Sequence, residues 1–213
     1  MTVTAIDDFV FENYSITKLV LPNTLTRIGD CAFINSTSLK KVIIPDSVTF
    51  IGNGAFAYAP IEQLKLGSSV QTIDDYAFEL ATITSLTLPN TLTFIGESTF
   101  ENAVLKTLNL PNSLVTIESG AFSHSVLTEL TLPNSLQTIG DKAFQYSTLS
   151  TLTIPSSVQT IGDRAFRKSA LESLIIQGKG SSNCLTTGSG KFTSLGTDEV
   201  FGWKNGENIV CEP

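Results

Sequence analysis

One short pattern recurs through most of this 213-residue chain and constrains its fold more than any other feature. An isoleucine returns every 22 or 23 residues, and a phenylalanine always follows it five positions later. The isoleucines are Ile6, Ile28, Ile51, Ile73, Ile95, Ile117, Ile139 and Ile161, and the phenylalanines are Phe11, Phe33, Phe56, Phe78, Phe100, Phe122, Phe144 and Phe166. A unit this short cannot bury its own apolar residues, so the units must stack and share one core. We expect the phenylalanines to form one buried column.

The pattern inside each unit predicts a short strand followed by a tight turn. The unit is L-x-x-L-x-L-P-x-[ST]-L-x-x-I-G-x-x-A-F, and its L-x-L part alternates as a strand with one buried face does. Proline ends this strand in six units, because it has no N–H for a strand ladder. The I-G-x-x-A-F part predicts one turn of α- or 3₁₀-helix, bent at the glycine. Stacked units then form an α/β solenoid with one sheet of parallel strands about 4.8 Å apart.

This unit resembles the BspA-like, or Treponema-type, leucine-rich repeat. The similarity covers about residues 3–177, in about eight repeats of 22–23 residues, and it implies a right-handed coil with a parallel β-sheet on one face. The common leucine-rich repeat has Asn or Cys after its strand, whereas this chain has a hydroxyl residue, which we expect to bond to turn backbone groups. These residues are Thr24, Ser47, Ser69, Thr91, Ser113, Ser135 and Ser157.

The two ends of the chain depart from the repeat. Residues 1–5 match the last part of a unit, so we expect the solenoid, residues 1–177, to start within a repeat of a longer protein; an open first strand edge is the alternative. After Ile176 the period is lost, and residues 178–213 combine glycine and serine with scattered apolar residues. We expect this segment to cap the last coil, the alternative being a tail or a linker.

Composition argues against several classes of function. The formal net charge is −7 and the pI is about 4.7, which argues against nucleic-acid binding, because that function needs a clustered basic surface. No apolar run reaches the roughly 18 residues of a membrane span. Residues 1–20 show no signal peptide.

The three cysteines bear on location. Cys184 and Cys211 both lie in the expected cap and form the only plausible disulfide, because Cys31 lies far along the stack, beyond the roughly 7 Å that bridged Cα atoms allow. A disulfide implies an oxidising compartment, and hence a cell-surface or secreted protein. Three reduced thiols would instead indicate a cytoplasmic protein.

No residue pattern indicates catalysis, and we predict that the chain is not an enzyme and holds no cofactor or metal. His124 is the only histidine, and no nucleophile or orienting partner is marked beside it. Acidic residues recur two positions after the isoleucine without the alternating Gly/Asp loop of calcium-binding repeats, so we interpret them as N-caps of the helical turns. They are Asp8, Asp30, Asp75, Glu97, Asp141 and Asp163.

The outward side chains of the expected strands form the candidate ligand-binding set. The first three units are basic there and include two exposed aliphatic residues, whereas later units carry small hydroxyl residues. The candidates are Lys18, Val20, Lys40, Lys41, Ile43 and Lys65. A solvated sheet face without any ligand would tolerate the same residues. Both interpretations stay open at this point.

Members of the BspA-like family are often described as surface proteins of bacteria or protists that bind host or matrix proteins. The resemblance therefore implies a non-enzymatic protein-binding or adhesion module with a host or matrix protein as ligand. The alternative is an intracellular leucine-rich-repeat scaffold or regulator that uses the same face. Neither the ligand's identity nor the oligomeric state follows from the sequence.

Overall fold

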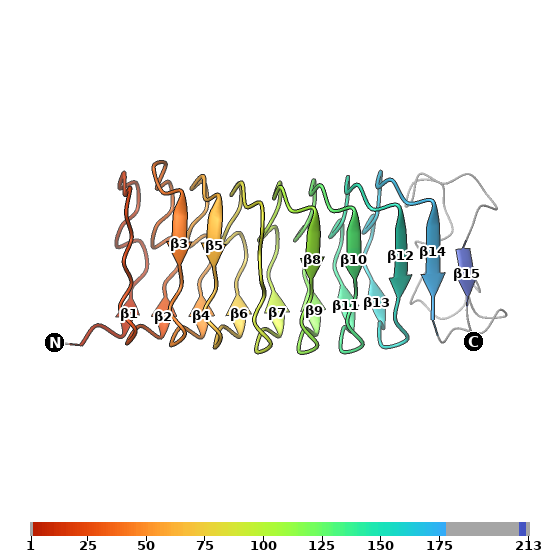
Figure 1. Ribbon diagram of the computed structural model, residues 1–213, viewed down its shortest axis with the longest axis horizontal. Coiled ribbons are helices and arrows are strands. Elements are labelled where there is room, and N and C mark those ends of the chain that lie inside the picture. The colour runs from red at the N-terminus through yellow and green to blue at the C-terminus, as the bar shows by residue number, and fades with distance from the viewer. Residues whose placement is uncertain (1, 178–208, 212–213) are drawn as a thin grey trace.

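The chain winds into a rod of eight coils that follow one another along its long axis (Figure 1). This computed structural model describes residues 2–177 and the backbone of residues 209–211. Every coil holds a two-residue strand that ends on the repeating isoleucine, and six coils hold a second strand formed by the L-x-L segment. All strand pairs are parallel, which confirms the predicted solenoid.

The isoleucine strands form one continuous eight-stranded sheet. They are β1 (Ala5–Ile6), β2 (Arg27–Ile28), β4 (Phe50–Ile51), β6 (Thr72–Ile73), β7 (Phe94–Ile95), β9 (Thr116–Ile117), β11 (Thr138–Ile139) and β13 (Thr160–Ile161). In each pair isoleucine lies opposite isoleucine. Seven of the eight isoleucines are buried, Ile6 at the end being half-buried. This register brings every coil into the same orientation.

The L-x-L strands form three small sheets rather than the one sheet that we expected. The sheets are β3 (Lys41–Ile43) with β5 (Gln63–Lys65), β8 (Thr107–Asn109) with β10 (Glu129–Thr131), and β12 (Thr151–Ile154) with β14 (Ser173–Ile176) and β15 (Ile209–Cys211). The breaks fall at the fourth coil, which has no such strand, and between β10 and β12. The central leucines beside the breaks, Leu86 and Leu130, are only half-buried, so these two segments pack less closely against the core than the other L-x-L segments do.

The prediction of a helical turn after the isoleucine was wrong, because residues 2–177 contain no helix. Instead, each turn has two residues with a left-handed backbone, three and seven positions after the isoleucine, with φ between +47° and +65°. These residues direct backbone N–H groups along the rod. Phe33 N, for example, donates to Ala55 O in the next coil at 2.8 Å. The turns are therefore held by neighbouring coils rather than by a local helix.

We expected the glycine after the isoleucine to set a bend in the turn, but its role is different. Gly29 has no positive φ. A Cβ placed on it would lie 2.7 Å from both the carbonyl carbon of Asp7 and the backbone nitrogen of Asp8. Glycine at this position thus allows two coils to approach closely.

The recurring carboxylates are not helix N-caps, and this prediction was also wrong. They accept hydrogen bonds from the backbone of the following coil: Asp8 Oδ1 from Asp30 N at 2.8 Å, and Asp141 Oδ1 from Asp163 N at 2.7 Å. Asp75 Oδ1 accepts from the backbone N of Glu97 in the same way. Asp8, Asp30, Asp75 and Asp141 each join two coils in this way.

The hydroxyl residues after the strands do bond to backbone, as predicted. In five of the seven positions, the hydroxyl donates to a carbonyl oxygen of the preceding coil at 2.6–2.7 Å. The five are Thr24, Ser47, Thr91, Ser113 and Ser135. These bonds replace the Asn contacts of the common leucine-rich repeat.

The phenylalanines form a stacked column through the core, with neighbouring ring centroids 5.1–5.8 Å apart and ring planes within 15° of parallel. Seven of the rings are fully buried, and Phe11, at the end of the column, is half-buried. Burial of each ring contributes about 1.5–3 kcal/mol. The column runs from the first coil to the eighth and links them into one core.

The segment 178–213 contributes one described element. Its strand β15 pairs with β14, with Ile176 opposite Cys211. The rest of the segment, including Cys184 and the side chain of Cys211, lies outside the described residues. The cap and the Cys184–Cys211 disulfide stay predictions.

Candidate ligand-binding surface

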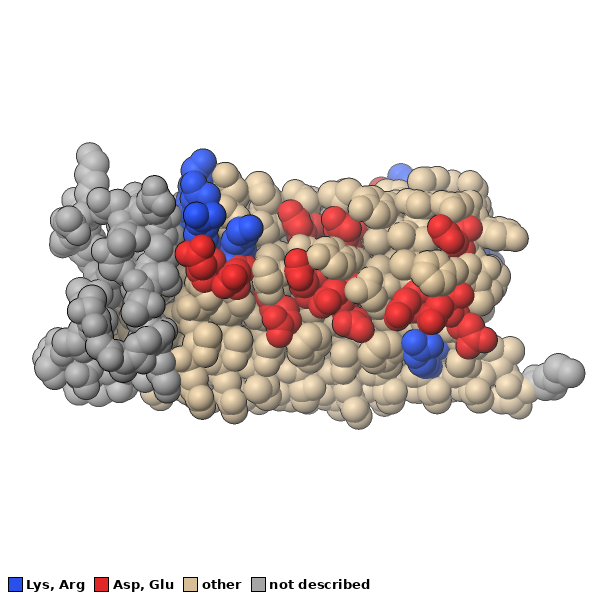
Figure 2. Space-filling model, turned by 180° about the vertical axis from the view of Figure 1, so that it is seen from behind, with Lys and Arg blue, Asp and Glu red and all other residues tan. Residues whose placement is uncertain are grey.

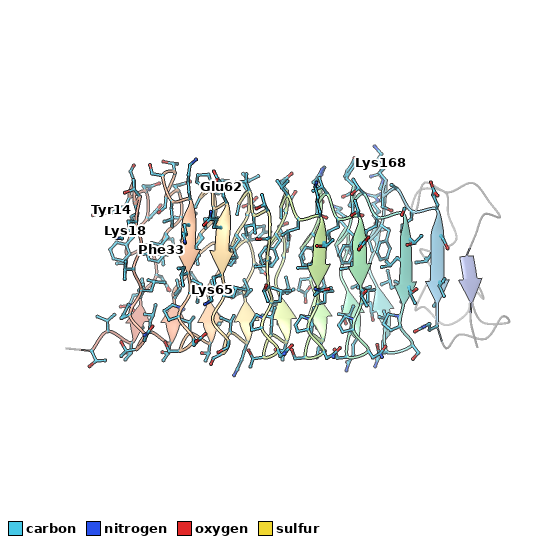
Figure 3. The ribbon with its side chains drawn as sticks, in the orientation of Figure 1. Tyr14, Lys18, Phe33, Glu62, Lys65 and Lys168 are labelled. Carbon is cyan, nitrogen blue, oxygen red and sulfur yellow. The ribbon has the colours of Figure 1, made fainter. Side chains whose placement is uncertain are left out.

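Strands β3 and β5 bring most of the predicted basic residues to one outward face. Lys41 lies opposite Gln63, and Ile43 lies opposite Lys65, while the residues between them point into the core. One coil earlier, Lys18 and Val20 are also exposed, and Figure 3 shows Lys18 and Lys65 at this end of the rod. We call Lys18, Val20, Lys41, Ile43 and Lys65 the basic strand patch.

The basic strand patch combines cations with exposed aliphatic surface. Val20 is 78% exposed and Ile43 is 50% exposed. Within residues 2–177, Lys18 and Lys41 form no ion pair. The patch thus offers positive charge and apolar contact together.

Two neighbouring groups reduce the positive charge that the sequence suggested. Lys40 precedes β3 and its Nζ pairs with Glu62 Oε1 at 3.0 Å, so we do not count it in the patch, and its predicted role in ligand binding stays a prediction. Asp46 lies near Lys65. The backbone N–H and the hydroxyl of Ser68 lower the pKa of Asp46, and the charge of Lys65 lowers it further. The patch therefore keeps two lysines whose charge is unpaired and one that is partly balanced.

The strand face is hollowed beside its two breaks. A hollow of about 670 Å³ lies between β5 and the fourth coil, and Asp46, Lys65 and Leu86 line it. A second hollow of about 760 Å³ lies over β10, β12 and β14, and its lining residues carry no charge. Asn109, Thr131 and Thr153 are among the latter. The face thus divides into a basic end and an end of mostly hydroxyl and amide residues, which also carries Glu129 on β10.

The opposite face carries a band of carboxylates that sequence reasoning missed. Figure 2 shows acidic side chains over most of the coils and basic side chains gathered at the C-terminal coils. The carboxylates occupy the first, second and sixth positions after the isoleucine, and the basic residues are Lys142, Arg164, Arg167 and Lys168. From the sequence we considered only the second position, as a calcium site or as caps, whereas the three positions counted together predict the band.

The carboxylates of this band interact with one another and with tyrosines. The Tyr76 hydroxyl donates to Glu97 Oε1 at 2.8 Å, and this hydrogen bond, with burial, raises the pKa of Tyr76 to about 12. Burial and the charge of Glu101 raise the pKa of Glu79. In the part of the chain that the structure describes, no three His, Cys, Asp or Glu side chains meet as metal ligands.

The residues with chemical reactivity are poorly placed for catalysis. His124 is exposed, and its ring stacks on Tyr146 at 4.4 Å. Burial and the nearby charges of Asp30 and Glu12 raise the pKa of the Cys31 thiol. A thiol with a raised pKa is a weak nucleophile at neutral pH.

Comparison with known families assigns the repeat. Two overlapping stretches, residues 4–126 and 71–194, match the family described as "BspA type Leucine rich repeat region (6 copies)". The chain belongs to the BspA-type leucine-rich repeat family. This confirms the resemblance read from the repeat unit. Among curated proteins, a search gave no significant match.

Solved structures similar to this chain include a leucine rich cell surface protein from Faecalibacterium prausnitzii A2-165. It is 28% identical, with a TM-score of 0.60, and the match covers 82% of this chain and 59% of that chain. The leucine-rich repeat protein of T. pallidum is 22% identical, with a TM-score of 0.55 over 97% of this chain and 91% of that one, and shares the fold. This chain thus spans less than two thirds of the F. prausnitzii protein.

Among residues 2–177 and 209–211, no helix has the length and hydrophobicity needed to cross a bilayer.

Proposed function

We propose that this BspA-type chain is a non-enzymatic protein-binding module of a bacterial cell-surface or secreted protein, with a role in adhesion to a host or matrix protein. The observation that carries the proposal is the similarity to the F. prausnitzii cell surface protein, at 28% identity over 82% of the chain. The rigid array of coils supports it, because an extended repeat surface offers many side chains in fixed positions.

The basic strand patch is the surface that we assign to this ligand. Lys18, Lys41 and Lys65 provide positive charge in a chain whose net charge is −7. Opposite charges speed association and favour the correct partner, while Val20 and Ile43 supply the apolar contact that holds it. The ligand is therefore an acidic protein surface.

A binding assay tests the assignment. The chain is applied to a panel of purified, acidic extracellular-matrix proteins, and the triple variant K18E/K41E/K65E is compared with wild type. We expect wild-type binding to weaken with salt, because the charges are exposed, and the triple variant to lose binding.

The matched control is Lys40→Gln. Lys40 pairs with Glu62 and lies off the patch, so this variant should bind as wild type does. Equal binding by K18E/K41E/K65E and wild type would move the site away from the patch. If the wild-type chain binds none of the acidic proteins in the panel, the proposed function is wrong.

Location is tested separately. The mass of the non-reduced protein, taken from its native source, should be lower by two hydrogen atoms if Cys184 and Cys211 are bridged, as in an oxidising compartment. An unshifted mass would favour the intracellular scaffold.

A further inference from the structure

Five consecutive coils expose a large apolar side chain along one edge of the rod. These side chains are between 36% and 47% exposed. They are Tyr58, Leu80, Val104, Val126 and Tyr146, and we call them the apolar edge strip. In the described residues, every other exposed large hydrophobic residue belongs to the first coil or to the strand face.

The strip uses two positions of the repeat, and the seventh position of the fifth and sixth coils holds the polar residues Asn102 and His124. Its members follow the repeating isoleucine by seven or nine positions. Lys168 follows Ile161 by seven positions, and Figure 3 places it on the upper edge of the rod. The residue between the two positions is small and buried, such as Ala81. Coils stacked about 4.8 Å apart make the strip about 19 Å long from the third coil to the seventh.

Three of the five strip residues occupy a backbone position that disfavours them. Tyr58, Leu80 and Tyr146 have φ values of +61°, +60° and +59°. The left-handed region suits Asn and is unfavourable for a bulky side chain. Asn fills this same position in three other coils, at Asn13, Asn35 and Asn102.

Leu80 is the clearest member of the strip. Its side chain cannot hydrogen-bond, and it is 45% exposed, so little burial offsets the backbone cost. Tyr146 differs, because His124 stacks on its ring and Lys168 lies 5.2 Å from its centroid. Leu80 is therefore the strip residue whose exposed position is least explained by contacts within the described residues.

Carboxylates border the strip. Glu79 and Glu101 each precede a residue of the seventh position, and burial, together with the charge of Glu101, raises the pKa of Glu79. Glu79 also lies near Tyr58, and its charge raises the pKa of the Tyr58 hydroxyl. A cation placed against this pair relieves their repulsion. Figure 2 shows the acidic band to which they belong.

We propose that the apolar edge strip docks an amphipathic segment of a partner protein whose apolar side is flanked by Lys or Arg. A strip of about 19 Å matches about 13 residues of α-helix. Apolar contact with the strip holds the segment, and its basic residues lie against Glu79 and Glu101. This surface is separate from the basic strand patch, so the inference does not rest on the proposed function.

The test uses a synthetic amphipathic helical peptide of leucine and lysine and its matched leucine–glutamate version. Fluorescence anisotropy measures binding of each labelled peptide to the full chain and to L80N, V104T and V126T. We expect the lysine peptide to bind, the glutamate peptide not to bind, and L80N to weaken binding about tenfold, as loss of a central contact does. The urea midpoint of L80N should equal or exceed that of wild type, because Asn suits the left-handed backbone.

Matched controls separate this result from general stickiness. Val20→Thr removes an exposed apolar residue on the strand face and should leave peptide binding unchanged. Equal binding by L80N and wild type, or by the two peptides, would overturn the proposal. A lower urea midpoint for L80N would show that Leu80 serves the fold instead. A dimer of the chain alone that L80N abolishes would assign the strip to a second copy and overturn the basic partner.

Discussion

Phe100 shows how single residues hold this molecule together. Its ring stacks on Phe78 and Phe122 at 5.8 and 5.5 Å, and no part of it is exposed. A side chain in such a column contacts both neighbouring coils, so its loss weakens two interfaces at once. The contribution of each ring therefore depends on the coils beside it.

Replacing Phe100 by Ala tests this point. We expect the free energy of unfolding to fall by about 3–5 kcal/mol, because the substitution leaves a cavity between two coils. Urea unfolding followed by circular dichroism measures the change, with exposed Thr107→Ala as control. An unchanged urea midpoint for Phe100→Ala would contradict the stacked core.

At the residue scale, side-chain contacts could be predicted from the sequence, whereas the backbone conformation of the turns could not. The column and the hydroxyl bonds follow from residues that recur at fixed positions, such as Phe100 and Ser113. The left-handed turns were missed because glycine or asparagine fills these positions in only some coils, such as Gly54 and Asn35, while residues such as Cys31 fill them in others. Such conformations are set by hydrogen bonds to the next coil, which no local pattern reveals.

At the element scale, the two sides of a coil behave differently. The isoleucine strands pair without interruption from β1 to β13, whereas the L-x-L strands break at the fourth coil and between β10 and β12. The L-x-L pattern of Leu86 is as regular in sequence as that of Leu108, so the breaks could not be predicted. Hollows of about 670 and 760 Å³ lie beside these breaks.

The last strand offers a test at this scale. Deleting residues 178–213 removes β15 and leaves the edge of β14 unpaired. An open edge pairs with other chains, so we expect the truncated chain to associate in sedimentation velocity experiments and to unfold at lower urea. If the truncated chain fails to fold, Val210→Pro in the full chain weakens the β14–β15 pair alone. A monomeric truncated chain of unchanged stability would show that the segment is not a cap.

At the scale of the whole molecule, the rod presents distinct surfaces at fixed spacings. A basic patch and a region of mostly hydroxyl and amide residues share the strand face, and a carboxylate band covers the opposite face (Figure 2). The sequence predicted the patch, since alternation in a strand shows which side chains point outward. It predicted neither the Lys40–Glu62 pair nor the apolar edge strip, which depend on how successive coils align.

The central claim, that a protein ligand binds the basic strand patch, is tested most directly by lysine footprinting. The chain is acetylated with and without the best-binding matrix protein, and mass spectrometry compares each lysine. We predict that Lys18, Lys41 and Lys65 lose reactivity in the complex while Lys106 and Lys142 keep theirs. Unchanged reactivity of Lys18, Lys41 and Lys65, with protection at Lys142 instead, would contradict the account.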